Sequence, residues 1–349
     1  MEDVKGKTGK PIVPRNTLIT GEIIDVLQAF LIDEVDVEEV DYNKTTTKMN
    51  KDGKHEDTKQ VVQPVPSLQK GEFVDHYLQV VDQLKKEFKK WQAGIDVDVL
   101  TIRKNIIPLF DHFLKNPYHL LVIHKYGQKQ DDFYLHAIST ALISGLIAKK
   151  LDFPKSDANQ VVLAAVLSNC GMAKLDPVLM KKSFYTEIEE KEIRKHPGFS
   201  YKMVQDIPSL NQGAKLAILQ HEEREDGSGY PFGEKGDRIH PYAKIIACSD
   251  EYYKIFRNPK NSRTTTPFQA IEKLESECFG KIAIDVIDAL KTSIAQYAVD
   301  VNVLLSNHMA GKIVFVDLNS LSQPVVRLEE DGQIISLHEQ PQLKIIDVF

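Results

Sequence analysis

The chain has 349 residues, of which 42% are hydrophobic and 27% are charged, and its formal net charge is −6. This length supports one large domain with appendages, or two to three small domains, and a sizeable hydrophobic core. The negative charge and the lack of a clustered basic patch argue against a nucleic-acid polymer as a partner.

The N-terminal residues 1–43 are expected to form a small α+β module. Short extended pieces flank a helical pattern in which Ile23, Ile24, Leu27, Phe30 and Leu31 share one face. Residues 44–60 are almost free of apolar side chains, so they cannot bury enough surface to offset the entropy lost on ordering. We therefore expect a flexible linker over residues 44–66.

Helical patterns fill most of the chain that follows. Residues 67–127 are expected to form a helical connecting segment, and residues 128–305 an all-helical domain, with prolines such as Pro108 at helix starts and stops. The tail 306–349 changes to short β-type runs, two of them joined by the turn that ends at Gly332. The predicted fold class is mainly α, with a small N-terminal α+β module and a short β-rich C-terminal tail.

Cysteine usage and hydropathy predict a cytoplasmic protein. Cys170, Cys248 and Cys278 are widely spaced and form no CxxC pair, which argues against a disulfide framework and a zinc ribbon. No apolar run approaches the roughly 20 residues of a membrane helix, and the first ten residues lack an apolar signal core. We expect no membrane association.

Five polar residues of the helical domain occur where helical spacing directs them toward apolar faces: His136, Asn169, His196, His221 and Asp250. Asn169 follows Val162 and Val166 at helical spacing, so it is expected to face where the valines face. Each residue alone is compatible with a capped or hydrogen-bonded core position. Their order and settings together favour a metal site.

The order of these residues resembles the HD-GYP branch of the HD-domain phosphohydrolases over residues 128–298. The matching positions are, in chain order, His136, Ser168-Asn169, Cys170-Gly171, His196-Pro197, His221-Glu222, Asp226 to Pro231 and Asp250. The resemblance implies an all-helical HD-domain bundle. It also implies a bacterial protein that binds two or three iron or manganese ions and hydrolyses cyclic di-GMP.

The resemblance implies a residual metal site formed by His136, His196, His221, Glu222 and Asp250. The name-giving His-Asp dyad of the family falls here on Ser168 and Asn169, and the lysine that usually follows it falls on Met172, with Lys174 two places later. A neutral amide oxygen is a poor bridge between two divalent ions. We therefore expect no catalytic residues, and either a single iron or manganese ion or none.

The resemblance also bears on ligands and partners. Of the basic segment that grips the dinucleotide in the family, only Arg263 keeps its charge, with Arg257 and Lys260 as substitutes. The turn Gly229-Tyr230-Pro231 is retained, and in the family it lies near the substrate pocket and is thought to contact diguanylate cyclases. Its glycine also permits a tight backbone turn, which is a purely structural reason for its presence.

Three functions follow from the sequence. The first is a degenerate, non-hydrolytic HD-GYP protein that binds cyclic di-GMP or a signalling partner such as a diguanylate cyclase. The second is an active metal-dependent cyclic di-GMP phosphodiesterase whose site is rebuilt around Glu222. The third is a packing module that binds neither metal nor nucleotide. The sequence leaves a homodimer open.

Overall fold

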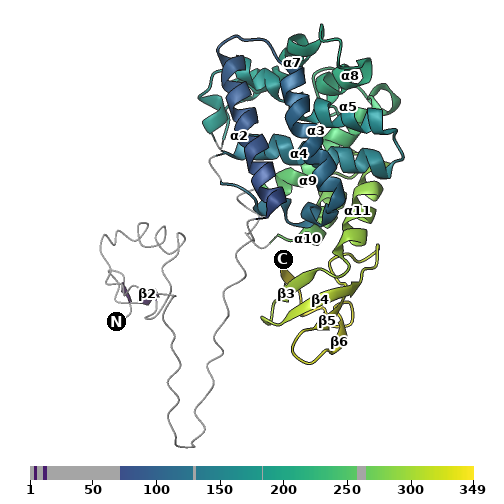
Figure 1. Cartoon of the computed structure of the whole chain (residues 1–349). Helices are drawn as coiled ribbons and strands as arrows, with labels where there is room; N and C mark the ends of the chain where they lie inside the picture. Colours follow the sequence, from purple (N-terminus) through teal and green to yellow (C-terminus); the bar gives the residue numbers. More distant parts are fainter. Residues whose placement is uncertain (1–3, 6–10, 14–70, 129–130, 183, 258–264) are drawn as a thin grey trace, which may run out of the picture. The chain divides into compact units, whose positions relative to one another are not determined.

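A computed structural model describes residues 4–5, 11–13 and 71–349, apart from residues 129–130, 183 and 258–264 (Figure 1). The chain divides into two units, residues 1–63 and 64–349, and each is described by itself. In the first unit, strands β1 (Val4–Lys5) and β2 (Pro11–Val13) pair in antiparallel fashion. The helix expected around residues 23–31 and the linker expected over residues 44–66 lie outside the described residues.

The second unit is mainly helical, which confirms the predicted class. Its α-helices are α2 (Glu72–Gln92), α3 (Val99–Lys115), α4 (Asp132–Lys150), α5 (Lys155–Leu167), α6 (Glu187–Ile193), α7 (His196–Val204), α8 (Gln212–Gln220), α9 (Pro241–Arg257), α10 (Pro267–Glu277) and α11 (Ile284–Ala298). One of the short 3-10 helices between them matters below, η4 (Cys170–Lys174). Among the described helices, none combines the length and apolar composition that a membrane crossing needs.

Helix α4 lies at the centre of this unit and packs against α5, α9 and α2 (Figure 1). Every residue of α4 from 137 to 148 is buried, including Ser139 and Ser144. A helix with apolar residues on all sides is enclosed by the core. A Cβ added at Gly145 would lie 2.5 Å from Val162, so the close approach of α4 to α5 requires this glycine. The helix that carries His136 is thus held on every side.

Helices α2 and α3 share one hydrophobic core with the helices that follow. The Tyr77 hydroxyl of α2 is hydrogen-bonded to the Ser139 hydroxyl of α4 at 2.8 Å. The sequence places a helix boundary at Pro108, and this prediction is wrong, because Pro108 lies inside α3. Its neighbours Leu109 and Phe110 are buried, and this packing outweighs the backbone hydrogen bond that proline removes.

The C-terminal tail forms a five-stranded antiparallel sheet. Its strands are β3 (Asn302–Leu305), β4 (Ala310–Phe315), β5 (Val325–Leu328), β6 (Ile334–Ser336) and β7 (Ile345–Val348), in the spatial order β6-β5-β4-β3-β7. The expected hairpin turn joins β5 to β6, and Gly332 has a positive φ of 72° there. The ammonium of Lys125 pairs with the Asp347 carboxylate and donates to the Val348 carbonyl, so β7 is tied to the helical part.

The sheet begins earlier than the sequence predicts. Residues 302–305 were expected to continue the helical region, but α11 ends at Ala298 and Asp300 adopts a positive φ of 67°, so the chain turns into β3. Four residues are too few for a period-2 pattern to be distinguished from a helical one. Pairing with β4 and β7 decides the conformation of this segment.

We expect His119 to make the stability of this fold depend on pH. Its ring stacks on Phe73 at a centroid distance of 4.0 Å, its Nδ1 is hydrogen-bonded to the Tyr126 hydroxyl at 2.6 Å, and burial, followed by repulsion from His112, lowers its pKa to about 4. A histidine in the unfolded chain has a pKa of about 6.5. The contribution of neutral His119 to the free energy of unfolding is therefore fully present above that pH and is lost as the pH falls toward 4.

We expect wild-type protein to lose about 2 kcal/mol more of its free energy of unfolding between pH 7.5 and pH 5.0 than the His119→Phe variant. The phenyl ring keeps the stacking on Phe73 but takes up no proton. Urea unfolding of both proteins at the two pH values measures the difference. Equal pH dependence in the two proteins would show that His119 does not carry the effect.

Candidate functional site

Residues from four helical elements meet at one buried cluster. His136 lies on α4, His196 is the first residue of α7, His221 and Glu222 follow the end of α8, and Asp250 lies on α9. The ligand atoms of His196, His221 and Glu222 all lie within 4.8 Å of one another, and so do those of Glu222, Asp250 and Glu251. The structure thus brings together the five residues that the sequence singles out as metal ligands.

Tight packing at the start of α7 places His196. The Ser200 hydroxyl donates to the Ser168 carbonyl at 2.7 Å and accepts from the Gly171 N–H at 2.8 Å, which locks α7 onto η4. A Cβ added at Gly171 would lie 2.3 Å from the His196 carbonyl oxygen. The glycine after the dyad position therefore has a structural purpose, since it lets α7 approach closely enough to present His196.

The two central histidines are oriented as metal ligands usually are. Nδ1–H of His196 donates to the Ile193 carbonyl at 2.8 Å, and Nδ1–H of His221 donates to the Ile218 carbonyl at 2.9 Å. Each Nε2 atom therefore keeps its lone pair when the ring is neutral. Burial, then His221, lowers the pKa of His196 to about 4, and burial likewise lowers the pKa of His221.

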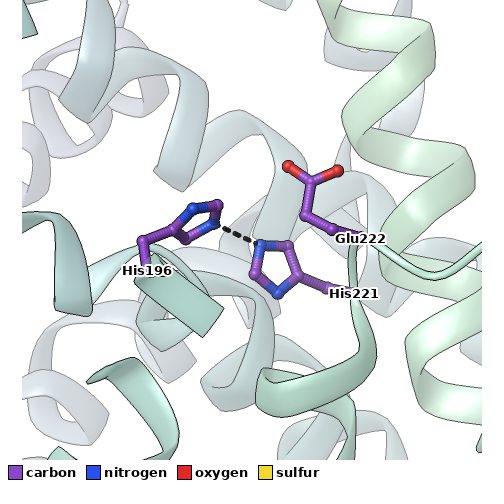
Figure 2. A group of neighbouring side chains, drawn as sticks. All are labelled: His196, His221 and Glu222. Atoms are coloured by element: carbon purple, nitrogen blue, oxygen red, sulfur yellow. Dashed lines mark hydrogen bonds between the residues drawn. The ribbon is translucent and has the colours of Figure 1, made fainter. Parts of the chain in front are cut away.

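The two Nε2 atoms face each other at 3.1 Å, and the Glu222 carboxylate lies beside them (Figure 2). This contact is a hydrogen bond when one Nε2 carries a proton, but two neutral rings that both carry Nδ1–H would direct two lone pairs at each other, and a metal ion bound by both would relieve that repulsion. Two neutral imidazoles fixed by backbone carbonyls, together with one carboxylate, fit a single divalent transition-metal ion. The half of the cluster formed by His196, His221 and Glu222 is therefore suited to one ion.

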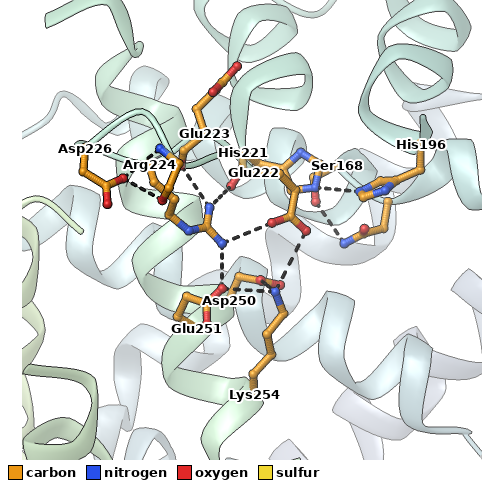
Figure 3. Close-up of polar contacts among 12 residues, drawn as sticks. Ser168, His196, His221, Glu222, Glu223, Arg224, Asp226, Asp250, Glu251 and Lys254 are labelled. Atoms are coloured by element: carbon orange, nitrogen blue, oxygen red, sulfur yellow. Dashed lines mark hydrogen bonds and ion pairs between the residues drawn. The ribbon is translucent and has the colours of Figure 1, made fainter. Parts of the chain in front are cut away.

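The other half of the cluster is occupied by protein cations (Figure 3). Nε2–H of His136 donates to Oδ1 of Asp250 at 2.7 Å, and the Lys254 ammonium lies 2.5 Å from Oδ2 of the same carboxylate. The Arg224 guanidinium lies 3.1 Å from Glu222 and 2.6 Å from Glu251. Both oxygens of Asp250 are thus engaged by groups of the protein itself.

These ion pairs keep the acids ionised despite their burial. Burial raises the pKa of Glu222, but Lys254, His221 and Arg224 together lower it to about 2. Burial acts on Asp250 in the same way, and Lys254 and His136 hold its pKa well below the usual range. For Lys254, burial lowers the pKa, but Asp250, Glu222 and Glu251 outweigh that effect and hold it well above its usual range.

The dyad positions supply no carboxylate to the cluster. The Ser168 hydroxyl donates to the Ala165 carbonyl at 2.9 Å, and the Asn169 amide donates to the Ser168 hydroxyl at 3.4 Å. The sequence extends the helical spacing of Val162 and Val166 to Asn169, which lies beyond the end of the helix. Helix α5 ends at Leu167, so Asn169 lies in the turn that precedes η4, where helical spacing no longer applies.

The lysine position of the family also provides no charge here. Met172 is buried, with an exposed fraction of 8%. Lys174 lines a cleft of about 670 Å³ together with Phe199 and Lys202, and none of the expected metal ligands lines that cleft. Arg257 is the last residue of α9, but its side chain, like Lys260 and Arg263, lies outside the described part of the chain.

The GYP turn packs directly on the segment that carries Glu222. The Tyr230 N–H donates to the Glu222 carbonyl at 3.0 Å, and the Arg194 guanidinium covers the Tyr230 ring at 5.1 Å. The buried Glu223 carboxylate accepts the N–H groups of Phe232 at 2.8 Å and of residue 234 at 3.0 Å. The turn therefore holds the ligand segment in place by backbone contacts.

We expect Gly229→Ala to lower the free energy of unfolding by about 2 kcal/mol or more. A Cβ at this position would lie 2.4 Å from the Glu222 carbonyl oxygen and 2.5 Å from the Arg224 nitrogen, and backbone atoms cannot move aside as a side chain can. Thermal or urea unfolding checks this. The control is Gly198→Ala, where nothing lies within 4 Å of the added Cβ and helix propensity favours alanine by up to about 1 kcal/mol. Equal stability of the two variants would contradict the packing argument.

Sequence reasoning missed four residues of this site: Glu223, Arg224, Glu251 and Lys254. One of them had a detectable pattern. Lys254 lies four residues after Asp250 on α9, and this spacing places the two side chains on neighbouring turns of one helix face. Glu251 directly follows Asp250, but its contact with Arg224 joins segments 27 residues apart and has no local pattern.

Comparisons with known proteins agree with this architecture. Residues 124–279 match a family model described as an HD domain. A cyclic di-GMP phosphodiesterase of Pseudomonas aeruginosa is 27% identical over 242 residues, which cover 69% of this chain and 58% of that protein. Another, of Borreliella burgdorferi, is 24% identical over 214 residues, which cover 61% of this chain and 56% of that protein. The chain thus spans little more than half the length of these relatives.

A solved structure shares the fold. The HDG"Y"P protein Bd1817 of Bdellovibrio bacteriovorus superimposes with a TM-score of 0.52 at 18% identity, over 65% of this chain and 73% of that one. With an HD domain over residues 124–279, with relatives named as cyclic di-GMP phosphodiesterases and with a fold neighbour named as an HDG"Y"P protein, the chain resembles the HD-GYP branch of the HD-domain family.

Proposed function

We propose that this protein acts in bacterial cyclic di-GMP signalling as a non-hydrolytic HD-GYP protein, which binds the nucleotide or a protein partner. One observation supports this most directly. No carboxylate stands at the dyad position, and both oxygens of Asp250 are engaged by His136 and Lys254. A carboxylate free to bridge two metal ions is therefore absent from these two positions.

Hydrolysis of a phosphodiester by a metal pair needs two ions about 4 Å apart that share an attacking hydroxide. One ion held by His196, His221 and Glu222 would supply a Lewis acid for a single phosphate oxygen. The two imidazoles would orient the site of that ion. Lys254 and Arg224 contribute positive charge beside Glu222. This arrangement supports anion binding better than in-line displacement.

One observation favours the second function, an active phosphodiesterase. Glu222 belongs to both triplets of ligand atoms, the one with His196 and His221 and the one with Asp250 and Glu251. A bridging carboxylate would have to occupy this place. For hydrolysis, Glu222 would have to release Arg224, which lies 3.1 Å away, and Asp250 would have to release Lys254.

The deciding experiment incubates the full chain anaerobically with iron(II) or manganese(II) and cyclic di-GMP, followed by chromatography for the linear dinucleotide and GMP. We expect no turnover, together with saturable nucleotide binding in calorimetry. Product that disappears in both His221→Ala and Asp250→Ala would establish the rebuilt phosphodiesterase instead. If the protein showed neither turnover nor nucleotide binding, its function would lie in protein contacts or in packing alone.

A protein partner is proposed at the GYP turn. Phe232 directly follows this turn and has an exposed fraction of 65%, whereas the turn itself is held by Glu223 and Arg194. A rigid turn that presents an exposed aromatic ring is suited to protein contact, since little entropy is lost on binding. The same contact is proposed for a diguanylate cyclase or another signalling protein.

A further inference from the structure

The acidic half of the cluster converges on one lysine. The Lys254 ammonium lies 2.5 Å from Asp250, 3.3 Å from Glu251 and 3.9 Å from Glu222 (Figure 3). An ammonium group carries three N–H donors, so it can serve three carboxylates at once. The carboxylates belong to two segments, the one after α8 and helix α9, and Lys254 joins them as a bound cation would.

The charges of this half are close to balanced without any ion. Glu222, Asp250 and Glu251 carry three negative charges, and Lys254 and Arg224 carry two positive charges, which leaves a net charge of −1. Without Lys254 the net charge would be −2, which a single divalent ion neutralises. Coulombic repulsion between the ammonium and an incoming divalent ion opposes binding in this half, and it acts at short range in a partly buried site.

The position of Lys254 is set by the helix that also carries Asp250. The two residues are four apart on α9, so the lysine reaches its partner over one helical turn. The Asp250 side chain is only 6% exposed and cannot turn to solvent, whereas Lys254 is 41% exposed. The carboxylate is therefore fixed, and the lysine is held to it by charge.

We propose that Lys254 is a resident cation that takes the place of a second metal ion, so that this centre holds one divalent ion, on His196, His221 and Glu222. This inference deepens the proposed function and rests on it in one respect, the absence of a working metal pair. The inference gives Lys254 as the reason why a second metal ion does not bind. The loss of the dyad removes one bridging carboxylate. The Lys254 ammonium then lies among the remaining carboxylates and neutralises part of their negative charge.

The test counts Mn²⁺ ions and needs no nucleotide. The full chain is stripped with chelator, dialysed to equilibrium against Mn²⁺ and assayed for metal per chain, and electron paramagnetic resonance distinguishes a coupled Mn²⁺ pair from a single ion. Lys254→Met and Lys254→Gln remove the charge, and Lys254→Arg is the matched control that keeps it. Circular dichroism before metal addition shows which variants are folded.

We expect one Mn²⁺ per wild-type chain and per Lys254→Arg chain. The neutral variants should bind a second ion with a coupled signal, or bind the first ion about tenfold or more tightly. Two ions in the wild-type protein, or none at all, would overturn the inference whether or not the variants fold. Folded neutral variants with wild-type count and affinity would overturn it as well. Nucleotide turnover plays no part, so the proposed function fails or holds by separate data.

Discussion

Replacing Arg224 by methionine is expected to lower the free energy of unfolding by about 3 kcal/mol, because it leaves two half-buried carboxylates without their partner. The Arg224 side chain is 12% exposed, and its guanidinium pairs with Glu222 and Glu251. It also donates to the carbonyls of His221 at 3.3 Å and of Glu223 at 2.9 Å. The single side chain thus binds both the acidic cluster and the backbone of the ligand segment.

Urea unfolding in the presence of chelator measures this effect without any contribution from bound metal. The matched control is Arg238→Met, since Arg238 is 81% exposed and its only described ion pair, with Glu234, is 3.6 Å long. We expect that control to change stability by less than about 0.5 kcal/mol. Similar losses in the two variants would mean that the Arg224 network contributes nothing beyond a surface ion pair.

Replacing His221 by alanine is expected to weaken Mn²⁺ binding by about 100-fold or more. The change removes one of the two imidazoles that face each other at 3.1 Å, and the hydrogen bond from Nδ1 to the Ile218 carbonyl that fixes the ring. Loss of an outer partner alone typically weakens metal binding 10–100-fold, so loss of the ligand itself should do at least as much.

Calorimetric titration of chelator-stripped protein with Mn²⁺ tests this expectation. His338→Ala is the matched control, because His338 is exposed and contacts only Gln323 in the C-terminal sheet among its described hydrogen bonds. Unchanged affinity is expected for that variant. If His221→Ala also kept the wild-type affinity, the ion would bind elsewhere and the paired imidazoles would have a structural role only.

The two effects together separate the functions that the site can support. A centre that binds one ion through His221 and depends on Arg224 for its shape fits a recognition module. A centre that binds two ions and turns over cyclic di-GMP fits the phosphodiesterase built around Glu222. The GYP turn is required in both, since it packs on the Glu222 segment at backbone distance.

Several features of this protein were determined by the sequence itself, because they depend on local spacing. The helical periods between residues 71 and 298, the antiparallel β5–β6 hairpin with Gly332, and the chain order of His136, His196, His221 and Asp250 all follow from patterns a few residues long. The replacement of the dyad by Ser168 and Asn169 was visible in the same way, and the expected loss of a bridging carboxylate came from residue chemistry alone.

Only the tertiary structure decided which charges meet. Arg224 pairs with Glu251 across two segments, and the Lys254 ammonium reaches Glu222 as well as Asp250, because α9 packs beside the end of α8. The burial of α4 from residue 137 to residue 148 and the strand conformation of residues 302–305 likewise depend on neighbours that are distant in sequence. Distances between helices are set by packing, and no local period encodes them, so the cation within the acidic cluster became evident only in the folded chain.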